Sequence, residues 1–82
     1  MLEQIIEYYP EEEFLTADGF DDAIIGVDDN SMNSEAVICY DQDKCIEILA
    51  KNMSSEDAVE YFYFNVAGSY VGKKTPKFIK LF

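Results

Sequence analysis

The sequence contains no histidine, and its two cysteines, Cys39 and Cys45, do not form a Cys-x-x-Cys pair. Without histidine, the Ser/His and Cys/His nucleophile systems lack their general base. Two isolated cysteines also fall short of the ligand set that a structural zinc site requires. We therefore expect buried, reduced thiols, and we predict no metal site, no cofactor and no enzymatic activity.

Long apolar runs are also missing. No apolar stretch approaches the ~20 residues of a membrane-spanning helix. Segment 1–7 lacks the basic residues of a secretory signal, and acids interrupt its apolar residues. We expect a soluble, cytoplasmic protein that does not bind membranes. A chain of 82 residues, 49% of them hydrophobic, is long enough for one domain, 1–82, with a single core.

Arginine is absent as well, and the charge is strongly negative, with 17 acids, six lysines and a formal net charge of −11. All 17 acids and two lysines lie at or before residue 60, a net charge of −15, and the other four lysines follow it. Direct nucleic-acid binding requires clustered cations, and arginine supplies bidentate base contacts. The composition therefore disfavours it and favours a partner with a basic surface. The alternative is that the charge only keeps a small protein soluble.

The segment 54–76 holds five of the twelve aromatic residues, four of them consecutive, and the clearest helix signals. Ser54 followed by Asp57 fits a capping box, and Gly68 can adopt the left-handed conformation that ends a helix. Between the cap and Gly68, four apolar residues lie on one stripe of the predicted helix: Val59, Phe62, Tyr63 and Val66. A strand is the alternative for 61–66, because alternate residues there also fit a half-buried strand. We favour the helix, because a strand leaves the cap and the glycine unexplained.

The rest of the chain predicts short elements. In order, these are a helix over 2–9, a second short helix beginning at Pro10, strands over 23–27 and 36–40, a helix capped by Asp41, and a last strand over 77–82. The resulting class is α+β. We expect a small antiparallel sheet, made of a β-hairpin and the C-terminal strand, packed against an αα-hairpin, with a short N-terminal helix.

The loop between the first two strands suggests a calcium site, because Asp28, Asn30 and Glu35 offer oxygen ligands. The EF-hand pattern fails, since Met32 occupies its third ligand position and Glu35 comes too early for the twelfth. Carboxylate pairs that could act as an acid and a base are too numerous for one to stand out. We therefore set both chemistries aside.

Tyr61 and Phe64 lie off the main apolar stripe of the predicted 54–68 helix. The helix is therefore apolar over more than the ~100° that one buried face requires. Either the N-terminal helices cover these two side chains, or a second copy of the chain does, because exposed aromatic patches often mark interfaces.

Several segments together resemble a known family. They are 22–28 (DAIIGVD), 45–49 (CIEIL), 58–62 (AVEYF), 64–66 (FNV) with Gly68, and 70–72 (YVG) with Thr75 and Pro76. Over 20–78 the chain is similar to small acidic proteins of bacteriophages and prophage regions whose function is mostly unassigned. The resemblance implies a phage or prophage setting in the cytoplasm of a bacterial host. The chain departs from the family pattern at Glu35-Ala36, where an arginine is common, and at Lys73, where an acid is common.

The sequence thus favours a non-enzymatic accessory protein that binds a basic protein of the host or the phage. A row of carboxylates can imitate duplex phosphates, so one form of this hypothesis is an inhibitor that mimics nucleic acid and acts on a host or defence protein. The predicted contact residues are Glu3, Glu7, Glu11, Glu12, Glu13, Asp21, Asp22, Asp28 and Asp29. The alternative is a homo-oligomeric structural or assembly module held by Tyr61 and Phe64.

Overall fold

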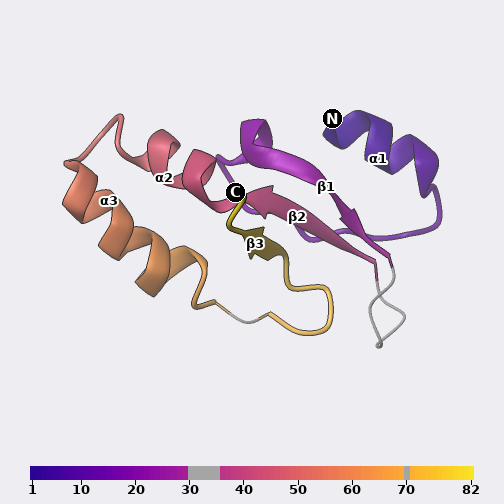
Figure 1. The fold of residues 1–82 in the computed structure, drawn as a ribbon. Coiled ribbons are helices and arrows are strands. Elements are labelled where there is room, and N and C mark those ends of the chain that lie inside the picture. The colour runs from indigo at the N-terminus through magenta and orange to yellow at the C-terminus, as the bar shows by residue number, and fades with distance from the viewer. Residues whose placement is uncertain (30–35, 70) are drawn as a thin grey trace.

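A computed structural model describes residues 1–29, 36–69 and 71–82. In these ranges, three short α-helices, two other helical segments and three strands follow one another. Figure 1 labels the α-helices and the strands. The elements are α1 (Leu2–Tyr8), the 3-10 helix η1 (Asp21–Ala23), β1 (Ile24–Asp28), β2 (Val37–Asp41), α2 (Gln42–Leu49), α3 (Ser55–Tyr61), the π-helix η2 (Phe62–Val66) and β3 (Lys77–Ile79).

The strands form one sheet in the order β1-β2-β3. The predicted α+β class is confirmed, with a β-hairpin and the C-terminal strand in the sheet. β1 and β2 are antiparallel, but β3 pairs with β2 in parallel, so the sheet is mixed rather than antiparallel throughout. A parallel neighbour requires a crossover connection, which α2 and α3 supply between β2 and β3 (Figure 1). α1 packs against β1, away from the α2–α3 pair.

The core is built around β2, the central strand. Its first four residues are each at most 5% exposed. The buried cluster consists of Ile5, Phe20, Ala23, Ile24, Ile38, Tyr40, Cys45 and Phe62. Phe78 of β3 stacks on Tyr40 and meets Phe62 edge to face, with ring centroids 5.3 Å apart in both pairs. These three rings join β2, β3 and η2 in one apolar contact.

Both helix starts predicted from capping residues are confirmed. The Asp41 carboxylate accepts hydrogen bonds from the main-chain N–H groups of Asp43 and Lys44. The Ser54 hydroxyl oxygen accepts one from the N–H of Asp57 at 3.1 Å. Each side chain pairs N–H groups that have no partner inside the first turn, so these sites start helices independently of tertiary contacts.

Segment 61–66 is helical, as predicted, but it continues from α3 as a π-helix. The face turned to the core carries Ala58 and Phe62, whereas Val59 and Tyr63 are exposed. The predicted left-handed Gly68 is wrong, because this residue has no positive φ. A larger residue would be crowded there, because an added Cβ would lie 3.0 Å from the main-chain oxygen of Tyr63 and the helix end would have to shift by a few tenths of an ångström.

The second short helix predicted from Pro10 does not form. Pro10 and Glu11 lie in a turn that follows α1, and no helix follows before η1. Tertiary contacts hold this segment instead, because the Lys74 ammonium pairs with Glu12 at 2.6 Å and lies 5.1 Å from the ring centre of Phe14. Of the calcium ligands considered above, the structure describes only Asp28, and residues 30 and 35 lie outside its described part.

Candidate interaction surfaces

Lysines of the C-terminal segment reach acids that are distant in sequence. Among the described residues, three ion pairs form: Lys74–Glu12 at 2.6 Å, Lys77–Asp28 at 2.5 Å and Lys80–Asp43 at 2.9 Å. The hydrogen bonds to Asp28 and Asp43 raise the pKa of Lys77 and Lys80, respectively. The basic end of the chain therefore folds back on its acidic part, and the charge separation along the sequence is reduced in space.

Three of the nine carboxylates predicted to bind a partner have contacts within the fold. Glu12 and Asp28 take part in ion pairs, and Asp29 accepts a 2.5 Å hydrogen bond from the Tyr9 hydroxyl. That bond raises the pKa of Tyr9 to about 12. All three carboxylates therefore have contacts within the fold, at the end of β1 and in the loop that follows α1.

The other six predicted carboxylates are exposed, and among the described residues none of them forms an ion pair. Glu3, Asp21 and Asp22 line one shallow hollow of about 390 Å³, where the first turn of α1 meets η1. Glu7 follows Glu3 by four residues and shares its side of α1. We call these four residues the α1–η1 acidic surface. Glu11 and Glu13 are exposed in the loop after α1 and do not line this hollow.

The predicted cover for Tyr61 and Phe64 is absent from the part of the chain that the structure describes. Their side chains are 45% and 79% exposed. The hypothesis that the N-terminal helices cover them is wrong, because α1 packs on β1 and the second helix does not form. The two rings lie in a shallow hollow together with Met53, Asp57, Glu60 and Asn65. We call Tyr61 and Phe64 the aromatic face.

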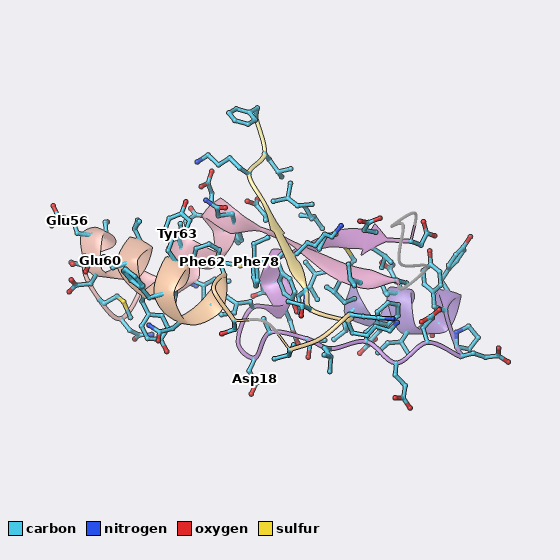
Figure 2. All side chains as sticks on the ribbon, turned by 90° about the horizontal axis from the view of Figure 1, so that it is seen from below. Asp18, Glu56, Glu60, Phe62, Tyr63 and Phe78 are labelled. Atoms are coloured by element: carbon cyan, nitrogen blue, oxygen red, sulfur yellow. The ribbon has the colours of Figure 1, made fainter. Side chains whose placement is uncertain are left out.

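A second groove, of about 370 Å³, adjoins the aromatic face, because Tyr61 lines both. Segment 16–20, η2 and segment 71–78 form its walls, with Phe20, Val66 and Phe78 among the apolar lining. Asp18 also lines this groove. Figure 2 shows Asp18 projecting outward from the loop before η1 and Glu60 projecting outward from α3.

The sequence analysis gave the acids beside these aromatic residues no role in partner binding, and it named Asp57 only for its place in the capping box. Asp57 and Glu60 precede Tyr61 and Phe64 by four residues, so helical spacing alone could have placed each acid beside its ring. No such spacing relates Asp18 to η2. The two segments are distant in sequence, and only the fold brings them to one groove.

The side chains of these surfaces can form ion pairs and apolar contacts with a partner. Cys39 and Cys45 are buried and unpaired, and burial raises the pKa of Cys45 to about 11. At neutral pH that thiol is protonated and is a poor nucleophile. In the described ranges, no group of three or more acidic or cysteine side chains is arranged to hold a metal ion.

Comparison with known protein families, curated proteins and solved structures finds no match. The resemblance to phage and prophage proteins therefore stays a prediction. None of the helices in the described part of the chain is long and apolar enough to cross a membrane.

Proposed function

We propose that this chain is a non-enzymatic accessory protein, of phage or prophage origin, that binds a basic protein through the α1–η1 acidic surface. One observation carries the proposal. Glu3, Asp21 and Asp22 share a hollow that no lysine lines among the described residues, although three lysines cross the fold to pair with other acids. The carboxylates of this surface are thus left available to an external cation.

Such a surface acts by electrostatic attraction. Exposed charges of one sign speed the encounter with an oppositely charged protein, and they suppress binding to acidic ones. A partner that normally binds nucleic acid has the cations that this surface needs, because it neutralises phosphates in the same way. The finer proposal is therefore competitive inhibition of a host or defence protein at its nucleic-acid site.

Competition with DNA tests this function. A labelled DNA duplex bound to a basic, sequence-nonspecific bacterial DNA-binding protein is titrated with the full chain, and fluorescence anisotropy follows its release. We expect wild type to release the duplex. The double variant Asp21→Asn/Asp22→Asn should need about fivefold more protein, since each exposed ion pair contributes roughly 0.5 kcal/mol.

The matched control is Glu47→Gln/Glu56→Gln, which removes the same charge from exposed positions outside the hollow. It should shift the midpoint less than twofold. Equal shifts for the two double variants would show that only net charge matters, and failure of wild type to release the duplex would contradict the mimicry.

Exposure of Tyr61 and Phe64 favours a second candidate, a homo-oligomeric module held by the aromatic face. In that case light scattering of wild type should give a multiple of the 9.4 kDa chain mass. Phe64→Ser should restore the monomer, because it removes the more exposed ring. A wild-type monomer across the micromolar range would count against this function.

A further inference from the structure

The groove beside the aromatic face has the size of a binding site. Its volume of about 370 Å³ lies within the roughly 300–1,000 Å³ range of ligand pockets. Phe20, Leu49, Val66 and Phe78 give it an apolar lining, and Tyr61 continues that lining onto the aromatic face. An apolar side chain entering the groove would leave water, which is the main favourable contribution to most protein association.

Among the described residues, the charged ones that line this apolar surface are all acidic. Asp18 lines the groove, and Asp57 and Glu60 line the hollow that holds Tyr61 and Phe64. Within the described ranges no lysine lines either hollow, and none of these three acids forms an ion pair. The surface thus combines an apolar centre with a negative border.

The acidic border indicates which kind of partner can bind at this surface. In a symmetric dimer both copies contribute the same patch to one interface, so that interface would contain the acidic border twice and, among the lining residues described, no lysine to offset it. Like charges brought together in this way destabilise an interface. A segment that places lysine or arginine against the border avoids this cost, and its cations can also lie over the rings of Tyr61 and Phe64.

We propose that the groove and the aromatic face together form a docking site for a basic amphipathic segment of a partner protein. Apolar side chains of that segment enter the groove between Tyr61, Val66 and Phe78. Its lysines or arginines face Asp18, Asp57 and Glu60. The site is separate from the α1–η1 acidic surface, so the two can be tested independently.

Two labelled peptides of equal charge test the proposal by fluorescence anisotropy with the full chain. One is an amphipathic Leu/Lys peptide, and the other carries serine in place of each leucine. We expect the Leu/Lys peptide to bind at least tenfold more tightly. Phe64→Ser should weaken its binding about fivefold by removing apolar contact, and Asp57→Asn/Glu60→Gln should do so about fivefold by removing two opposite charges.

The matched control is again Glu47→Gln/Glu56→Gln, which removes two exposed acids that line neither hollow. It should change the affinity for the Leu/Lys peptide less than twofold. Circular dichroism should show unchanged folding in all variants, since every substituted side chain is exposed.

Three outcomes would overturn the proposal. The two peptides could bind equally, which would reduce the interaction to net charge. The control could weaken binding as much as Asp57→Asn/Glu60→Gln. Light scattering could show a dimer that Phe64→Ser abolishes, which would assign the face to a second copy of the chain. None of these results bears on DNA release by the α1–η1 surface, so the failure of one proposal is distinguishable from that of the other.

Discussion

Replacing Phe62 by alanine is expected to lower the free energy of unfolding by about 3–5 kcal/mol, the range found for buried aromatic residues. Phe62 is 0% exposed and meets the ring of Phe78 edge to face at 5.3 Å. The substitution leaves a cavity between η2 and β3. Small domains are stabilised by about 5–15 kcal/mol in total, so this one change should bring the protein close to unfolding.

Urea denaturation followed by circular dichroism measures this loss. Phe64→Ala is the matched control, because Phe64 lies two residues away in the same π-helix and is 79% exposed. It should change the stability by less than about 0.5 kcal/mol. A loss below about 1 kcal/mol for Phe62→Ala would contradict the packing of η2 on the sheet.

Replacing Tyr40 by alanine is expected to cost a similar amount, about 3–5 kcal/mol. Tyr40 is 0% exposed, its ring stacks on Phe78, and its hydroxyl oxygen accepts a 2.7 Å hydrogen bond from the main-chain N–H of Ala17. Tyr40→Phe retains the ring and removes the acceptor. It should cost about 1–2 kcal/mol, because the Ala17 N–H then loses its partner.

The difference between these two variants separates the packing contribution from the hydrogen bond. Tyr8→Phe is the control for loss of a hydroxyl, since Tyr8 is 77% exposed, and it should be neutral within about 0.5 kcal/mol. If Tyr40→Phe were equally neutral, the hydrogen bond would not hold segment 16–20 against the sheet.

Both experiments also bear on the docking groove. Tyr40 holds segment 16–20 through Ala17, and its ring and that of Phe62 both contact Phe78. Segment 16–20 and Phe78 form walls of that groove. Loss of either contact should therefore widen the groove before the domain unfolds, and the affinity for the Leu/Lys peptide should fall in Tyr40→Phe.

The exposed ion pairs contribute less to stability than this core. Solvent screens exposed ion pairs and leaves them with little net stabilisation, and each of Lys74, Lys77 and Lys80 keeps part of its side chain in water. The ion pairs matter more for the surface charge, because they determine which acids remain unpaired. They occupy acids in the loop after α1, at the end of β1 and in the first turn of α2, whereas among the described residues no lysine lines the hollow of α1 and η1 or the border of the aromatic face.

Features that depend on neighbouring residues were determined by the sequence itself. The caps at Asp41 and Ser54, the β-branched strand segments and the helical state of 61–66 all follow from residues within a few positions of one another. A side chain that pairs an N–H three residues away stabilises the same local structure in any tertiary context. The α+β class and most element positions could therefore be predicted.

Features that depend on distant residues were decided by the tertiary structure alone. These are the parallel pairing of β3, the ion pairs of the C-terminal lysines, the exposure of Tyr61 and Phe64, and the groove that joins Asp18 to η2. Each requires segments tens of positions apart to meet, and their direction and distance depend on how all the intervening elements pack. Local propensity carries no information about that packing. The acids could thus be recognised from the sequence, but which of them remain available to a partner was decided by where the fold placed the lysines.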